Sequence, residues 1–191
     1  YFKGVLPAMV ARTGWNIGPN SSDVLVEMKG GSKHFGNHQH ADAGSFQIFY
    51  RGDLATDLGM YGFYGTPYDL GFNKRSIAHN TLLIYDPAEK IEHGKTNDGG
   101  QRFIQRHPVN AEMLEKDAYF NYGSTLSADF GPDLVRPYYT YLKSDLKAAY
   151  TDKISYYTRT FCFLNLDNTA TPAALIVLDR VTTSKPEFKK Y

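Results

Sequence analysis

Apolar and polar side chains alternate along several short stretches of this chain, with the two-residue period of a β-strand. In residues 22–29, for example, Val24, Val26 and Met28 fall on one face. Such alternation is typical of strands that bury one face and leave the other in water. The segments predicted as strands from this pattern, or from their β-branched and aromatic content, are 22–29, 45–50, 54–58, 78–85, 103–107, 111–122, 154–166 and 173–181.

Turn-forming residues separate these segments. Residues 51–53 and 167–169 are short polar turns, and each is predicted to join the strands beside it into a hairpin. The longer stretches 59–75 and 89–101 are rich in glycine and follow neither period, so they are predicted as loops. A loop as long as 59–75 is usually functional or disordered, and its aromatic side chains favour the functional alternative.

The predicted order of elements indicates a mainly β protein. Residues 6–12 fit a helix or an extended segment equally well, and residues 146–153 are equally ambiguous. Helix is otherwise expected to be scarce. Many short strands separated by turns predict an antiparallel β-sandwich or barrel.

Composition narrows the functional classes. The chain has 191 residues, which favours one domain, and its net charge of +1 argues against strong nucleic-acid binding. No apolar run reaches the roughly 18 residues that a membrane helix needs, so no membrane partner is expected. The chain begins at Tyr1 and stops at Tyr191 without terminal punctuation, and we therefore expect a fragment of a longer protein.

Histidine and aspartate residues form the main candidate site. His40, Asp57 and His79 are separated by 17 and 22 residues, a spacing that fits ligands on neighbouring strands. Zinc binds histidine nitrogen and carboxylate oxygen. His38 and His40 would share one face of an extended segment, so both could bind one metal. Alternatively, one binds the metal while the other points into a cleft, or the histidines only form hydrogen bonds in turns.

Several neighbouring side chains allow two interpretations. Asp42 is a rival metal ligand, but it also suits a turn cap before Gly44. Asn37 and Asn80 each adjoin a candidate histidine, and Asn80 is expected to be structural. The remaining histidines stand in polar loops and are expected to be solvated; they are His34, His93 and His107.

The glycine-rich loop carries a second candidate group. Tyr61, Tyr64 and Tyr68 lie close together there, and a tyrosine can transfer protons when a nearby cation lowers its pKa. Alternatively, these rings only pack. Lys74 and Arg75 follow, and they could bind carboxylate or sulfate, or could simply be solvated.

A cupin site is one competing interpretation of the histidines. Cupins also use two histidines separated by one residue and a later histidine, on a β-barrel. They usually place a glutamate shortly after the pair, whereas residues 41–45 contain none. This difference weakens the cupin interpretation without removing it.

Longer motifs carry a resemblance to one family. From about Met9 onward the chain resembles the heparinase II/III-like polysaccharide lyases, and most closely their heparinase II branch. The motifs that carry the resemblance are 36–40, 42–44, 46–48, 74–80, 82–87, 97–102, 130–133, 139–143, 172–177 and 188–190.

The resemblance implies an architecture. The parent protein would have an N-terminal α/α toroid followed by a large antiparallel β-sandwich. Residues 1–191 would then be a single β-sandwich domain, a fragment that lacks the toroid and the later strands. The family also implies a periplasmic or secreted bacterial protein and an acidic polysaccharide as substrate.

The resemblance further implies a reaction and its residues. These enzymes cleave glycosaminoglycans such as heparin or heparan sulfate by β-elimination next to a uronic acid. By position, His38 and Tyr64 would be catalytic, and Asn37 would contact substrate. A structural zinc ion would be bound by His40, Asp57 and His79, although Tyr61 or Tyr68 could replace Tyr64. Because other catalytic residues belong to the toroid, the isolated chain is expected to be inactive.

Two alternatives stay open beside the lyase. One is a carbohydrate-binding or scaffold sandwich without catalysis, in which zinc only fastens loops together. The other is a cupin-like metalloenzyme, in which His38 and His40 both bind a redox metal.

Overall fold

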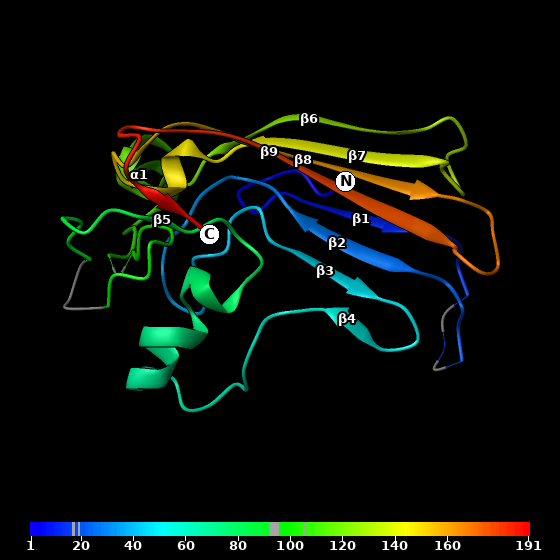
Figure 1. Ribbon diagram of the computed structural model, residues 1–191, viewed down its shortest axis with the longest axis horizontal. Coiled ribbons are helices and arrows are strands. Elements are labelled where there is room, and N and C mark those ends of the chain that lie inside the picture. The colour runs from blue at the N-terminus through cyan, green and yellow to red at the C-terminus, as the bar shows by residue number, and fades with distance from the viewer. Residues whose placement is uncertain (17, 19, 92–95, 105) are drawn as a thin grey trace.

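The strands form two larger antiparallel sheets and one small one. The computed structural model describes residues 1–191 except 17, 19, 92–95 and 105 (Figure 1). The first sheet has the order β1 (Ala8–Arg12), β2 (Leu25–Lys29), β3 (Phe46–Phe49) and β4 (Asp53–Ala55). The second sheet has the order β6 (Ser124–Gly131), β7 (Tyr139–Asp145), β8 (Ile154–Asn165) and β9 (Ala173–Thr183). The short strands β5 (Ile84–Tyr85) and β10 (Lys189–Lys190) pair with each other.

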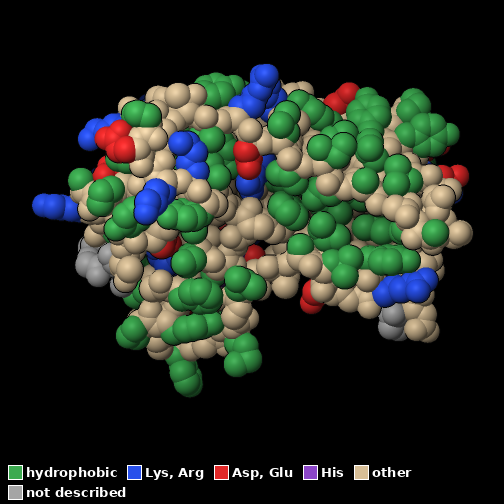
Figure 2. Space-filling view, viewed as in Figure 1, with side chains coloured by type: hydrophobic (Ala, Val, Ile, Leu, Met, Phe, Trp, Pro, Cys, Tyr) green, Lys and Arg blue, Asp and Glu red, His purple; other side chains and the backbone are tan. Residues whose placement is uncertain are grey.

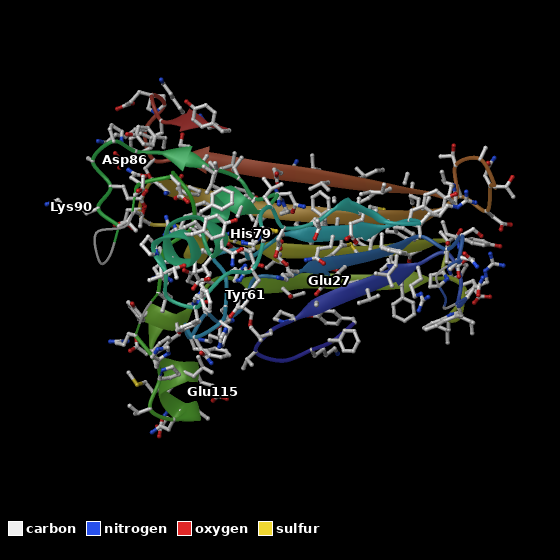
Figure 3. All side chains as sticks on the ribbon, turned by 90° about the horizontal axis from the view of Figure 1, so that it is seen from below. Glu27, Tyr61, His79, Asp86, Lys90 and Glu115 are labelled. Atoms are coloured by element: carbon white, nitrogen blue, oxygen red, sulfur yellow. The ribbon has the colours of Figure 1, made fainter. Side chains whose placement is uncertain are left out.

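The two four-stranded sheets pack face to face. Met9 and Met28 from the first sheet share a buried cluster with Leu142, Phe161 and Phe163 from the second. The view from below shows the first sheet lying over the second (Figure 3). Burying one such side chain contributes on the order of 2 kcal/mol. The prediction of a mainly β, antiparallel sandwich is therefore confirmed.

A second buried cluster supports the loops at one end of the sandwich. It joins Ile84, Phe120 and Leu146 with the aromatic rings of Tyr150 and Tyr157. The helices, β5 and the C-terminus gather at this same end (Figure 1). The candidate site is therefore carried by loops that have a core of their own.

Most of the strongly alternating segments are strands. The predicted strands 22–29, 45–50 and 54–58 correspond to β2, β3 and β4, and the last two are antiparallel neighbours. Residues 154–166 and 173–181 correspond to β8 and β9, which also pair antiparallel. Both predicted hairpins are thus confirmed.

Two predicted strands are wrong. In residues 78–85 only Ile84–Tyr85 is a strand, because the Asn80 side chain bonds to the backbone of Phe46 instead of continuing a ladder. Residues 111–122 contain the helix α1 (Ala111–Lys116) and a 3₁₀ helix, Ala118–Phe120. Asn110 caps α1 by accepting a hydrogen bond from the Met113 amide, which favours the helical start.

Other segments also differ from their predictions. The predicted loop 59–75 contains a π-helix, Asp69–Asn73, and a 3₁₀ helix follows at Ser76–Ala78. Residue 105 lies outside the described residues, and the described residues of 103–107 form no strand. The ambiguous segment 6–12 contains the strand β1 (Ala8–Arg12). The ambiguous segment 146–153 contains the 3₁₀ helix Lys147–Ala149. Strands β6 and β7 were not predicted.

Helices are short throughout the described residues. None of them is both long enough and apolar enough to span a bilayer.

Candidate metal centre and adjoining cleft

Three predicted ligands meet at the end of the first sheet. The His40 Nδ1 atom lies 3.2 Å from the His79 Nε2 atom. The His79 Nδ1 atom lies 2.7 Å from Asp57 Oδ1, and Asp57 Oδ2 lies 3.9 Å from His40 Nδ1. Asp57 follows β4, His40 precedes β3, and His79 follows the 3₁₀ helix Ser76–Ala78. Figure 3 labels His79 where loops leave the sheets.

The geometry of this group suits a metal ion. One ligand atom from each of His40, Asp42, Asp57 and His79 can be chosen so that all lie within 4.8 Å of one another. Nitrogen ligands about 2.0–2.1 Å from a tetrahedral zinc would lie roughly 3.3 Å apart, which matches the two imidazoles. Asp42 is also ion-paired with Lys29, so this carboxylate already has a cationic partner.

The electrostatics keep these side chains ready to bind a cation. Burial lowers the pKa of His40, and the neighbouring His79 lowers it further. Burial alone would raise the pKa of Asp57, but the hydrogen bond and charge of His79 outweigh it and lower that pKa. Metal ligands must be neutral imidazole and ionised carboxylate, and these shifts favour the neutral form of His40 and the ionised form of Asp57.

A hydrogen-bond network holds the loops that carry the ligands. Ser76 Oγ donates to the carbonyl of Ala41 over 2.6 Å, and it accepts from the amide of Gln101. The Gln101 side chain accepts from the amide of Ala43 and donates to its carbonyl. The segments that carry His40 and His79 are therefore fastened to one another. The sequence pattern gave no sign of Gln101, which stands in a polar loop.

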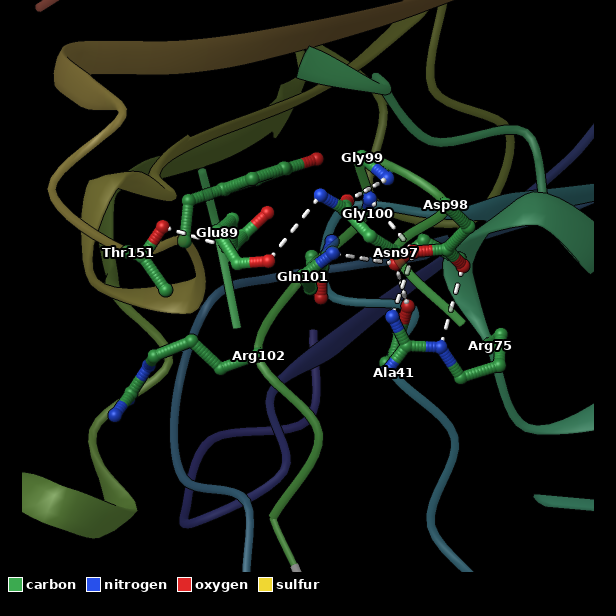
Figure 4. Close-up of polar contacts among 12 residues, drawn as sticks. Ala41, Arg75, Glu89, Asn97, Asp98, Gly99, Gly100, Gln101, Arg102 and Thr151 are labelled. Carbon is green, nitrogen blue, oxygen red and sulfur yellow. Dashed lines mark hydrogen bonds and ion pairs between the residues drawn. The ribbon is translucent and has the colours of Figure 1, made fainter. Parts of the chain in front are cut away.

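A buried ion pair anchors the same region. The Arg75 Nη2 atom lies 2.6 Å from Asp98 Oδ1, and the Arg75 side chain is fully buried (Figure 4). Arg75 is thus neither solvated nor free to bind sulfate, as had been considered from the sequence.

A tight turn separates His38 from the metal-binding group. Gly36 and Asn37 both have positive φ, at 76° and 60°. The predicted extended segment is therefore wrong, and His38 and His40 point to different neighbours. The exposed His38 ring lies 4.8 Å from the ring of Tyr64 and lines a hollow of about 370 Å³ with Lys29 and Lys33.

The three loop tyrosines have different surroundings. Tyr64 contacts His38, and the ammonium of Lys74 lies 4.0 Å from its ring centroid. Tyr61 is exposed, whereas Tyr68 packs on Phe72. Tyr64 is therefore the loop tyrosine that the structure places beside His38.

Asn37 and Lys74 meet on the other side of this turn. The Asn37 carbonyl accepts a hydrogen bond from Lys74 Nζ over 3.1 Å, while the Asn37 residue itself is exposed. Asn37 and Tyr64 line a second hollow of about 250 Å³. Lys74 is buried and paired with the Asp69 carboxylate, so of the two alternatives considered from the sequence the solvated one is wrong.

The remaining predictions have mixed outcomes. His34 is buried, with 3% of its surface exposed, so its predicted solvation is wrong. His107 is exposed and contacts the Phe35 carbonyl, while His93 lies outside the described residues. Asn80 has the structural role that was expected of it.

The comparison with protein families agrees with this architecture. A family model described as "Heparinase II/III-like, C-terminal" matches residues 11–127, which include the whole His/Asp group, His38 and Tyr64. The chain therefore belongs to the heparinase II/III-like family and carries its C-terminal domain. No curated protein sequence matches the chain.

Proposed function

We propose that this chain is the β-domain of a polysaccharide lyase that cleaves uronic-acid-containing glycosaminoglycans, of the heparin or heparan sulfate type, by β-elimination. One observation carries the proposal: His38 is exposed beside Tyr64, whereas His40 faces His79 and Asp57. Family membership supports the general reaction class.

The reaction requires three things of the protein. A base must remove the proton at C5 of the uronate, the developing negative charge must be neutralised, and an acid must protonate the leaving O4. In this proposal His38 and Tyr64 exchange protons with the substrate, and Asn37 contacts it. The hollow beside His38 is lined by Lys29 and Lys33 and also by three acidic side chains, and one of these, Asp42, already pairs with Lys29.

The His40, Asp57 and His79 group has a separate role. A zinc ion bound there would cross-link the loop after β4, the segment before β3 and the 3₁₀ helix Ser76–Ala78. His38 is not among the residues of the metal-binding group. We therefore propose that the metal site has a structural role. Such a cross-link stabilises the folded chain and fixes the turn that presents His38.

The proposed parent protein extends beyond this chain. Residues 1–191 would be one β-sandwich domain, preceded by an α/α toroid that supplies the other catalytic groups and followed by further strands. The isolated chain would then be inactive. A periplasmic or secreted bacterial location follows from the family, because its substrates are extracellular polymers.

A binding scaffold without catalysis is the second candidate. Its supporting observation is the exposed apolar side chains on the loop after β4, including Met60, Tyr61 and Phe63. Figure 2 shows hydrophobic side chains over the protruding lobe that carries this loop. Rings exposed in this way could stack on sugars. A cupin-like enzyme is less well supported, since His38 does not join the metal-binding group.

Activity of the toroid-containing protein tests the proposal. His38→Ala should abolish most formation of unsaturated uronate, which ultraviolet absorbance detects, while substrate binding and metal content persist. Tyr138→Ala is the control, because Tyr138 is exposed just before β7 and lies outside the residues that line the two hollows. Sugar binding without unsaturated product in the wild-type protein would favour the scaffold instead.

A further inference from the structure

Lys74 is a buried cation at the centre of the proposed catalytic region. Only 2% of its surface is exposed. Its Nζ atom lies 3.1 Å from the Asn37 carbonyl oxygen and 3.1 Å from Asp69 Oδ2. The same ammonium lies 4.0 Å from the ring centroid of Tyr64. A lysine side chain has three donors and no acceptor, so these partners account for its position.

Asp69 offsets the free-energy cost of burying the Lys74 ammonium, because it forms an ion pair with it. Isolated buried charges are strongly unfavourable, and a hydrogen-bonded opposite charge offsets that penalty. Burial would raise the pKa of Asp69, but the Gly65 amide, Lys74 and Asn73 outweigh it and lower the pKa. The carboxylate is therefore ionised at neutral pH and fixes the ammonium in place.

Lys74 also holds both ends of the segment that carries His38. Its side chain binds the carbonyl of Asn37, the residue before His38. Its backbone carbonyl accepts a hydrogen bond of 2.8 Å from the amide of Ala41. Asn37 has a φ of 60°, a left-handed conformation that is uncommon outside glycine but that asparagine adopts more readily than most residues.

We propose that Lys74 is a positioning residue that sets the His38 imidazole against the Tyr64 ring. This inference rests on the proposed function, because it gives these two rings their catalytic role. The lysine acts through the Asn37 carbonyl on one side and through the face of Tyr64 on the other. Its charge is paired with Asp69 and buried, although Lys74 also lines the hollow that Asn37 and Tyr64 share.

The two rings provide a direct structural measurement. In the 191-residue chain, nuclear Overhauser effects between His38 and Tyr64 ring protons report their contact without any lyase assay. Lys74→Met should abolish these effects and Lys74→Arg should retain them in part, because arginine keeps the pair with Asp69. Lys153→Met is the matched control, since Lys153 is fully buried and its Nζ atom lies 2.5 Å from Glu89 Oε2.

A double variant keeps the test decisive if Lys74→Met does not fold. Lys74→Met with Asp69→Asn removes both charges, so no uncompensated carboxylate remains buried. The ring contact should still be lost in this variant. Retained contact in folded Lys74→Met or in the folded double variant, or equal loss in Lys153→Met, would overturn the positioning role.

Kinetics of the toroid-containing protein add a second readout. Lys74→Met should lower kcat by about 100-fold with little change in KM and no loss of metal, as expected for a misplaced catalytic pair. Lys153→Met should leave kcat within a few fold. If His38→Ala is fully active while the ring contact still depends on Lys74, the proposed function fails and the positioning role stands.

Discussion

The Nδ1 atom of His40 lies 3.2 Å from the Nε2 atom of His79, although 39 residues separate them in the chain. Asp57 adds a carboxylate 2.7 Å from the other nitrogen of His79. Because these ligands come from three segments, an ion bound among them would tie together a large part of the first sheet and its loops.

Loss of a ligand should therefore lower stability through loss of metal. His40→Ala should release the ion and lower Tm, and a chelator should lower the Tm of the wild-type chain in the same way. At free metal about 100 times the Kd, the expected stabilisation is about 2.7 kcal/mol. Calorimetry with and without chelator measures it, and His107→Ala should behave as wild type.

The two sheets should depend on shared core residues. Phe161 is fully buried and packs with Phe46 across the sandwich at a centroid distance of 5.9 Å. Phe161→Ala should lower the free energy of unfolding by about 3–5 kcal/mol, because it removes apolar contacts and leaves a cavity. Ile176→Ala, on the exposed face of β9, should change it by less than about 0.5 kcal/mol. Urea unfolding measures both losses. An equal loss of unfolding free energy in the two variants would contradict the proposed packing.

The buried pair of Arg75 and Asp98 should be costly to break. Arg75→Met leaves the Asp98 carboxylate buried without its cation, and the expected loss is about 3–5 kcal/mol. The control is Arg136→Met, which removes an exposed pair with Asp167 and should cost less than about 1 kcal/mol. Denaturant midpoints compare the two, and similar losses would show that Asp98 finds another partner.

His34 should make stability depend on pH. Burial lowers its pKa from 6.5 to about 4, and its Nδ1 atom accepts from the Gly36 amide, which a protonated ring could not do. The unfolded chain therefore binds more protons between these two values. Stability from this group is complete above about pH 6.5 and falls by about 3 kcal/mol as the pH drops to about 4.

A variant without the titrating ring separates this effect from the other histidines. His34→Gln keeps an acceptor for the Gly36 amide but does not titrate, so its unfolding free energy should vary less over the same pH range. An unchanged pH profile in His34→Gln would show that other groups cause the acid sensitivity.

Local pattern was enough to predict the strands that alternate strictly. β2 buries every second residue along its length, and β9 alternates between half-buried and exposed residues over most of its length. β6 was not predicted, because its polar sequence becomes a strand through pairing with β7 and shifts register between Thr125 and Ser127. Residues 78–85 look like a strand, yet the contact of Asn80 with β3 decides their structure.

The candidate site was predictable in its residue types but not in its arrangement. The spacing of His40, Asp57 and His79 predicted a common site, and the structure brings these side chains together. The different contacts of His38, with Tyr64, and of His40, with His79, follow a turn in which Gly36 and Asn37 have positive φ, and no periodicity reveals this turn. The burial of Lys74 and His34 depends on partners that only the tertiary fold supplies.

Metal content of the purified chain, measured by plasma mass spectrometry in wild type, His38→Ala and His40→Ala, tests the separation of roles most directly. We predict about one zinc per chain in wild type and in His38→Ala, and its loss in His40→Ala. Loss of the metal in His38→Ala would contradict the account, because it would place His38 among the ligands and leave the cleft without its proposed base.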